Sequence, residues 1–319
     1  MKETFIAVIL SIAALFLSAP DVFSAAEKEV GNVRDIHGNA NILRERDKID
    51  ARKNESVFRA DTVKTLEKSR VKILFVDDSL LMLGENSSVF ISEHLKKGGG
   101  ESIFNLTDGV LNVIVGKKGF KVHTPTAISS ARGTSFLVWV EDGKTNMAVT
   151  EGRVDFSNAD EKVSGKLVIP AGKMSSIESG KPPTPAVVAP PEVIKVLYRQ
   201  TLEEKERWGP VILRAKGSAI APPHITNPAQ AKLMALRAAK VEAMRNLLEQ
   251  AQGVTIMGES TIQDFALKSD VIKSRVDSFI KGAWVSEERL LADGSYEVEM
   301  EIGLGIGFRR MFIEKAEEN

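Results

Sequence analysis

The sequence contains no cysteine among its 319 residues. This absence excludes a disulfide framework, a lipid-modified cysteine anchor and any metal site built on thiolates. Aromatic residues make up only 6% of the chain, and its three tryptophans and two tyrosines are too dispersed for a sugar-stacking platform. No charge of one sign is in excess, since 43 basic residues match 43 acidic ones. With no basic face in the sequence, we expect no nucleic acid partner.

The N-terminus carries a short apolar run at residues 5–17, preceded by Lys2. This run is shorter than the roughly twenty residues that a membrane-spanning helix needs. Ser24, Ala25 and Ala26 then supply the small residues of a cleavage site. We therefore predict a cleavable signal peptide over residues 1–26 and a protein that is periplasmic or extracellular. The alternative is an uncleaved inner-membrane anchor, which would be the chain's membrane contact.

Residues 29–177 are expected to form an all-β domain, because they contain short β-type runs separated by turn residues. The clearest hairpin signal is Asp142-Gly143, which lies between two runs of β-branched and aromatic residues. Asp108-Gly109 and Glu151-Gly152 are expected to mark two further turns. The spacing is typical of a β-solenoid or a β-sandwich, and periodicity does not decide between them.

The remainder of the chain is expected to be partly helical. A proline-rich stretch at residues 178–191 predicts a semi-rigid spacer, and apolar residues at helical spacing predict a connecting helix at 192–208. Residues 210–308 indicate a small α/β domain, whose first long helix should begin after Asn227 and stop at Gly253. The expected fold class is therefore multidomain, with an all-β domain followed by a small α/β domain.

One motif in the β-type region has a specific resemblance. Its TP and RGT elements are Thr124, Pro125, Arg132, Gly133 and Thr134. The motif resembles the extracytoplasmic domain of the ferric citrate regulator family, FecR, and the resemblance extends over about residues 29–158. It implies a module that engages another protein, as family members do when they relay the signal of an outer-membrane receptor.

These motif residues and the Asp142-Gly143 turn are the candidate site. Arg132, Asp142 and Gly143 are the candidate partner contacts. An ion pair between Arg132 and a nearby acidic residue is an equally supported alternative, in which Arg132 only stabilises the domain.

The C-terminal region has a second resemblance, carried by Arg245-Asn246-Leu247-Leu248-Glu249, Ile280-Lys281-Gly282-Ala283 and Asp293-Gly294-Ser295-Tyr296. Over about residues 211–304 it resembles the Lpp-twenty-like lipoprotein family and the N-terminal domain of flagellar assembly protein T. The resemblance implies a domain that acts through protein contacts at the cell envelope. Lipid anchoring is not implied, because the chain lacks the cysteine that carries the lipid.

The sequence offers no arrangement typical of catalysis. The four histidines lack metal-ligand spacing, and the glycine run at residues 98–100 is not followed by the Lys-Ser/Thr of a phosphate loop. Gly303, Gly305 and Gly307 are expected to form a terminal bend. We therefore expect no catalytic residue, metal or cofactor, and no enzymatic activity.

Together these observations predict a secreted, periplasmic, non-enzymatic adaptor that binds envelope proteins. Four residues precede the apolar run, so no cytoplasmic anti-sigma segment is expected. One alternative is a structural or assembly factor at the outer membrane, associated with flagella. Another is a peptidoglycan-binding or glycan-binding protein. Partner identity, oligomeric state and the packing of the two domains stay open at this point.

Overall fold

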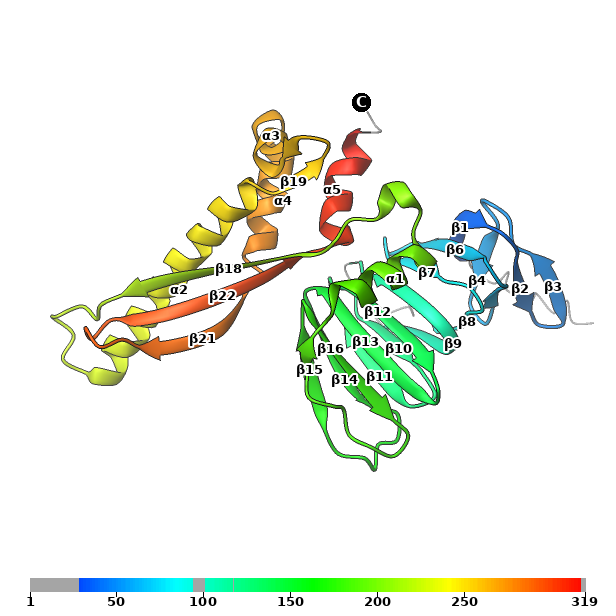
Figure 1. The fold of residues 1–319 in the computed structure, drawn as a ribbon, viewed down its shortest axis with the longest axis horizontal. Coiled ribbons are helices and arrows are strands. Elements are labelled where there is room, and N and C mark those ends of the chain that lie inside the picture. The colour runs from blue at the N-terminus through cyan, green and yellow to red at the C-terminus, as the bar shows by residue number, and fades with distance from the viewer. Residues whose placement is uncertain (1–28, 94–100, 117, 317–319) are drawn as a thin grey trace, which may run out of the picture.

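The computed structural model describes residues 29–93, 101–116 and 118–316. The predicted signal peptide at residues 1–26 lies outside the described residues, as does the glycine run at 98–100. The described part forms a β module and an α/β module, which extends to one side of the β module (Figure 1). This agrees with the expected mostly-β, multidomain fold. No helix in the described ranges is both long and apolar enough to span a membrane.

The β module consists of two sheets that share one long strand, β9 (Ser102–Ile114). Sheet A has the order β4-β1-β6-β7-β9-β12-β13-β16-β17, and sheet B the order β3-β2-β5-β8-β9-β10-β11-β14-β15. The other strands of sheet A are β4 (Ser56–Phe58), β1 (Glu29–His37), β6 (Arg70–Phe75), β7 (Leu80–Leu83), β12 (Ser135–Glu141), β13 (Lys144–Glu151), β16 (Lys173–Glu178) and β17 (Val187–Val188). The other strands of sheet B are β3 (Asp47–Asp50), β2 (Ala40–Arg44), β5 (Thr62–Thr65), β8 (Ser88–Glu93), β10 (Phe120–His123), β11 (Ala127–Ala131), β14 (Arg153–Asn158) and β15 (Lys166–Pro170). Side chains from both sheets enclose one core, so the β module is a sandwich.

The chain crosses repeatedly between the sheets, and many crossings contain a residue with positive φ. Nine such residues are Gly38, Asn54, Ala60, Lys68, Asn86, Gly109, Gly133, Gly152 and Gly172. The expected turn at Asp108-Gly109 is therefore wrong, because β9 continues through it and passes from sheet B to sheet A. Glu151-Gly152 is also a crossing rather than a hairpin, since β13 and β14 belong to different sheets.

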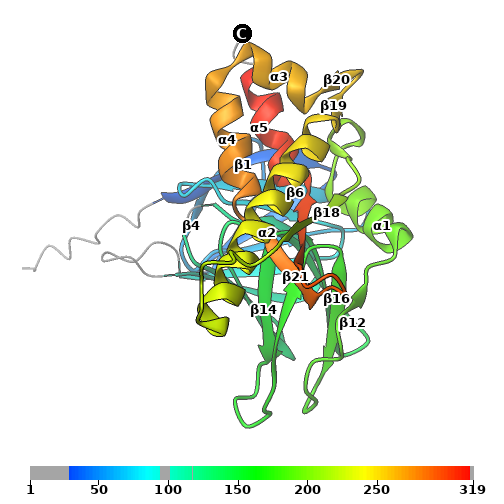
Figure 2. The same ribbon diagram turned by 90° about the vertical axis from the view of Figure 1, so that its left-hand side faces the viewer.

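Helix α1 (Pro191–Thr201) lies across the outer face of sheet A (Figures 1 and 2). Its apolar stripe, which includes Ile194 and Leu197, packs on Leu137 and Trp139 of β12. The alternate residues of β12 point into the sandwich core. This strand is therefore buried on both faces, which explains why its sequence is apolar at consecutive positions.

The proline-rich segment before α1 is not a free spacer. Its residues Val187–Val188 form β17, which pairs with β16 at the edge of sheet A. The Ala189 N–H also donates to the Gly172 carbonyl. The predicted connecting helix is shorter than expected, because α1 ends at Thr201 and a 3₁₀ turn (Glu204–Glu206) follows it. The connection between the modules is consequently held against the sandwich.

Three antiparallel strands form the sheet of the α/β module, in the order β18 (Val211–Ala219), β22 (Tyr296–Leu304) and β21 (Trp284–Leu290). Helix α2 (Pro228–Gln252) packs on one face. As predicted, the Asn227 side chain caps α2 by accepting from the Ala229 and Gln230 N–H groups. The helix ends at Gly253. Its φ of −79° shows that Gly253 does not adopt the left-handed conformation that often ends a helix.

The buried face of α2 is made mainly of small residues. It is a stripe of small residues at four-residue spacing with one leucine, namely Ala235, Ala239, Ala243, Leu247 and Ala251. Gly217 of β18 lies against it, and a Cβ at Gly217 would lie 2.2 Å from the Ala239 carbonyl oxygen. Small residues on both sides therefore allow the helix and strand to approach closely.

Short elements complete the α/β module: β19 (Thr255–Met257), β20 (Ser260–Thr261), α3 (Ile262–Lys268), α4 (Asp270–Ile280) and α5 (Ile306–Ala316). A hairpin turn at Asp293-Gly294 joins β21 and β22. Phe308 and Phe312 of α5 fill the core beside α3 and α4. The opposite sheet face is charged, with ion pairs such as Arg214–Glu301 and Arg289–Glu297.

Candidate functional site

Thr124 belongs to a buried hydroxyl cluster. Its Oγ1 lies 2.6 Å from the Thr145 Oγ1, and Thr126 Oγ1 lies at the same distance from Thr145. Thr124 Oγ1 also accepts a hydrogen bond from the Ala127 N–H at 3.0 Å. These bonds tie the turn between β10 and β11 to the start of β13, and only Pro125 in that turn is exposed. The TP part of the motif therefore stabilises the sandwich.

Arg132, Gly133 and Thr134 form the crossing from β11 to β12. Thr134 is buried, and its Oγ1 donates to the carbonyls of Arg132 and Arg153 at 3.0 and 3.2 Å. Gly133 has a φ of +57°, which suits glycine at this corner. The Arg132 side chain is exposed, and none of the ion pairs between described residues includes it. Among the described residues, Arg132 therefore has no stabilising ion pair.

Asp142-Gly143 forms the predicted two-residue hairpin between β12 and β13, with Glu141 opposite Lys144. Its residues are exposed and have φ values of +49° and +71°, as in a type I′ turn. The Thr124–Thr145 contact places this turn at the same end of the sandwich as Pro125. Arg132 follows the opposite end of β11. It is five residues, or about 16 Å of extended strand, from Ala127, where β11 begins. The structure therefore divides the candidate residues between two ends.

The β module also offers two open strand edges in sheet B. Among the described strands, β3 pairs only with β2, and β15 pairs only with β14. The β3 edge carries three charged residues in four, a composition that discourages strand addition. In β15, Val168 is 52% exposed. The β15 edge is therefore the better position for an incoming strand.

The two modules meet at a buried carboxylate that sequence reasoning treated as part of a turn. Glu151, at the end of β13, accepts a hydrogen bond from the Phe308 N–H at 3.0 Å and another from Ser135 Oγ at 3.1 Å. Burial raises the pKa of Glu151 to about 7, although these donors act in the opposite direction. A carboxylate of the β module therefore lies at the N-terminus of α5, where the helix dipole stabilises a negative charge.

The glycines after β22 make this contact sterically possible. A Cβ at Gly305 would lie 3.1 Å from Glu151 Oε2, and one at Gly307 would lie 2.5 Å from Ser135 Oγ. The expected terminal bend at Gly303, Gly305 and Gly307 is the junction between β22 and α5. This junction packs closely against Glu151. The alternating glycines Gly303, Gly305 and Gly307 were the available sequence signal, but the sequence does not show that they pack against Glu151.

A second set of contacts joins the connecting segment to sheet A. Glu206 forms an ion pair with Lys72 of β6. Burial, together with the neighbouring Glu203, raises the pKa of Asp35 in β1. Arg309 of α5 donates from Nε to the Ile256 carbonyl at 3.0 Å and from Nη1 to the Glu206 carbonyl at 3.4 Å. Residues 203–207 therefore belong to the contact region between the two modules, which we call the joint.

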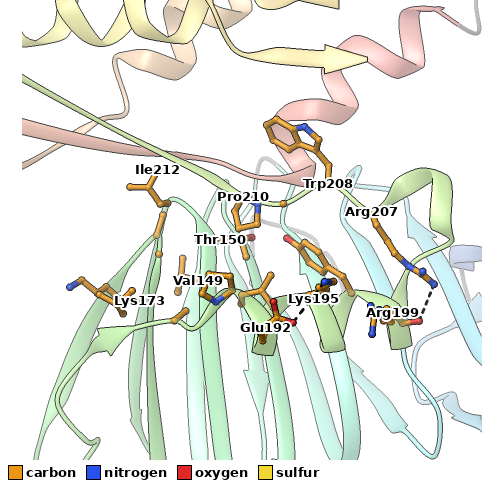
Figure 3. A pocket seen from close by; sticks show the side chains of 18 of the residues that line it. Val149, Thr150, Lys173, Glu192, Lys195, Arg199, Arg207, Trp208, Pro210 and Ile212 are labelled. Atoms are coloured by element: carbon orange, nitrogen blue, oxygen red, sulfur yellow. Dashed lines mark hydrogen bonds and ion pairs between the residues drawn. The ribbon is translucent and has the colours of Figure 1, made fainter. Parts of the chain in front are cut away.

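A cavity of about 670 Å³ lies beside this joint (Figure 3). It is bordered by α1, by the ends of β13, β16 and β17, and by the chain from Trp208 into β18. Trp208 packs against the apolar core of the α/β module and against the apolar cluster between α1 and sheet A. In the described part of the chain, no group of three or more His, Cys, Asp or Glu side chains is arranged to hold a metal ion.

Comparison with known proteins gives one family match, in which the FecR protein family model matches residues 61–155. Two crystal structures from Parabacteroides distasonis ATCC 8503, at 2.50 and 1.65 Å and each described as "a putative anti-sigma factor", are also similar. Both have 12% sequence identity and a TM-score of 0.37. The first alignment covers 44% of this chain and 64% of that one, and the second covers 58% and 74%. No curated protein matches the chain. Residues 61–155, which run from β5 into β14, are thus the part of the chain that matches the FecR protein family.

Proposed function

We propose that this protein is a non-enzymatic regulatory adaptor of the cell envelope whose β module binds another protein. The observation that carries the proposal is the FecR match at residues 61–155, which covers the centre of the sandwich. FecR domains engage partner proteins in signal relay, and that role transfers to this module. The proposal includes secretion by the N-terminal segment.

Two surfaces of the β module suit a protein partner. The first is the open edge of β15, where a partner strand could extend sheet B by backbone hydrogen bonds. The second is the corner at Arg132, whose guanidinium is exposed and is left out of the ion pairs between described residues. Strand addition supplies affinity, and a charged corner supplies register and specificity.

The proposal is tested with the full chain in a Gram-negative host. We expect processing near Glu27, recovery in the periplasm, and a crosslinked envelope protein that is identified by mass spectrometry. Val168→Lys should reduce its yield because a charged edge discourages strand pairing. Val76→Lys, the same substitution at an exposed position outside β15, is the matched control. Equal yields for the wild type and Val168→Lys would exclude the β15 edge. An unprocessed chain in the inner membrane would restore the anchor alternative.

The alternative function is that of an assembly factor acting through the α/β module. It is favoured by the way in which β18, β22, β21 and α2 extend away from the sandwich (Figure 1). A fragment containing only residues 210–319 would be a poor test, because α5 would lose its contact with Glu151. Substitutions in the intact chain are preferable. If Val241→Lys on α2 abolishes crosslinking and Val168→Lys does not, the α/β module carries the function.

Glycan binding is the least supported function. Trp139 is buried and the other two tryptophans are partly buried in the apolar clusters. A sugar-stacking platform would need exposed aromatic faces. Retention of the purified chain on isolated cell wall would nonetheless revive this alternative.

A further inference from the structure

We propose that the cavity between the two modules binds a small amphipathic anion, with an apolar body and one carboxylate or phosphate group. The inference goes beyond the proposed protein-binding function and does not depend on it. A volume of about 670 Å³ is within the usual range of small-molecule sites, which occur preferentially where domains meet.

The walls of the cavity supply an apolar environment. Val188 comes from β17, Ile194 from α1, and Trp208, Pro210 and Ile212 from the chain that enters the α/β module. Figure 3 shows Trp208, Pro210 and Ile212 along the chain that leads into β18, with Val149 and Lys173 on the side of sheet A. A ligand body in this position would contact both modules and bury apolar surface against them.

The charges around the cavity are predominantly positive. Five lining residues are basic and two are acidic: Lys173, Lys195, Arg199, Arg207 and Arg214 against Glu192 and Glu204. Lys195 pairs with Glu192, and Arg214 pairs with Glu301. These are the two lining cations whose charges have carboxylate partners.

Three lining cations therefore have no carboxylate partner among the described residues: Lys173, Arg199 and Arg207. Two hydrogen bonds to backbone carbonyls orient the Arg207 side chain. Its Nε donates to the Leu202 carbonyl at 3.3 Å, and its Nη2 donates to the Arg199 carbonyl at 3.4 Å. Guanidinium groups match carboxylate and phosphate oxygens in geometry and charge. An anionic group at the mouth and an apolar body inside would satisfy both features of the cavity.

The binding test uses the purified full chain and four probes, each below its micelle concentration. Sodium decanoate and decyl phosphate carry the tail and the anion, decanol carries only the tail, and inorganic phosphate carries only the anion. Isothermal titration should show saturable one-to-one binding of decanoate or decyl phosphate, with decanol and phosphate each at least tenfold weaker. Trp208 provides a fluorescence signal for the same site.

Three variants locate the site. Lys173→Gln/Arg199→Gln should weaken decanoate binding at least fivefold and leave decanol binding unchanged. Gly209→Phe should abolish binding of both, because a Cβ at Gly209 meets no atom within 4 Å and the ring can occupy the cavity. Arg153→Gln/Lys64→Gln, at exposed positions in β14 and β5, is the charge-matched control and should bind as the wild type does. Circular dichroism confirms that each variant is folded.

The proposed source of the anion is a free molecule rather than a lipid in a bilayer. Binding to phosphatidylglycerol vesicles is measured in parallel, to distinguish a free anion from a lipid in a bilayer. Binding to vesicles without saturable binding of decanoate or decyl phosphate would overturn the proposal. Decanol binding as tight as decanoate binding would also overturn it, as would decanoate binding that is unchanged in Lys173→Gln/Arg199→Gln and Gly209→Phe.

Discussion

Glu151 Oε2 accepts a hydrogen bond from the Phe308 N–H at 3.0 Å, across 157 residues of sequence. The carboxylate ends a central strand of the sandwich, and the N–H begins the last helix of the α/β module. The two modules are therefore joined by a buried charged group and not only by the chain that connects them. This contact makes the joint sensitive to pH and to the size of the neighbouring residues.

The pH dependence of the joint follows from the pKa of Glu151, which burial raises from 4.5 to about 7. Because the folded protein holds this proton more tightly, the free energy of unfolding falls as pH rises from about 4.5 to 7. The loss is at most about 3 kcal/mol. We predict that the wild type loses this stability relative to Glu151→Gln in urea unfolding between pH 5 and 8. Glu141→Gln, at an exposed position, is the control and should parallel the wild type. A constant difference between the wild type and Glu151→Gln would contradict the prediction.

Gly307→Ala tests the close approach of α5 to the sandwich. Its Cβ would lie 2.5 Å from Ser135 Oγ and 2.9 Å from Glu151 Oε2. Alanine favours a helix by about 1 kcal/mol over glycine, yet we expect a net loss of about 1–3 kcal/mol because the joint must open. Gly253→Ala, at the end of α2 with a φ of −79° and a nearest atom at 3.7 Å, should be neutral or stabilising. Thermal unfolding compares the two, and equal behaviour would show that the joint tolerates the methyl group.

Gly109→Ala tests the crossing of β9 between sheets. The residue has a φ of +85°, and its Cβ would lie 2.5 Å from the Ser87 Cα. A backbone atom cannot move aside cheaply, so we expect a loss of about 3 kcal/mol or more. Gly143→Ala also has positive φ but has open space around it, and should cost about 1 kcal/mol. If both variants unfold at the same temperature, β9 does not depend on this close contact.

Arg132→Ala decides between the two roles that the sequence allows for this residue. Because Arg132 is exposed and lies outside the ion pairs between described residues, its removal should change the free energy of unfolding by less than about 0.5 kcal/mol. The yield of the crosslinked partner protein should fall. A large loss of stability, measured by urea unfolding, would instead identify Arg132 as a structural charge.

Local chemistry predicted those elements whose partners are close in sequence. Asp142-Gly143 forms its hairpin because the paired strands directly flank it, and Asn227 caps α2 because its hydrogen-bond donors are two and three residues away. Asp108-Gly109 has the same composition as a hairpin turn but connects two sheets. A positive φ requires the same residue type in both cases, so only long-range strand pairing distinguishes them.

The joint could not be predicted for a related reason. Glu151 looks like an ordinary turn residue, and its donor on Phe308 is remote in sequence. The close packing of α2 on β18 also depends on a remote residue, because Gly217 makes room for the stripe of alanines. In the candidate site, residue types were informative about turns but not about which end of the sandwich each turn occupies.

Site-specific photo-crosslinking in cells tests the central proposal, binding through the β module, most directly. A photoreactive amino acid is placed in the full chain at position 132 or 168, and at 241 on α2 as a control of similar exposure in the other module. We predict one defined envelope-protein adduct from position 132 or 168 and none from 241. An adduct from 241 alone would contradict the account and assign partner binding to the α/β module.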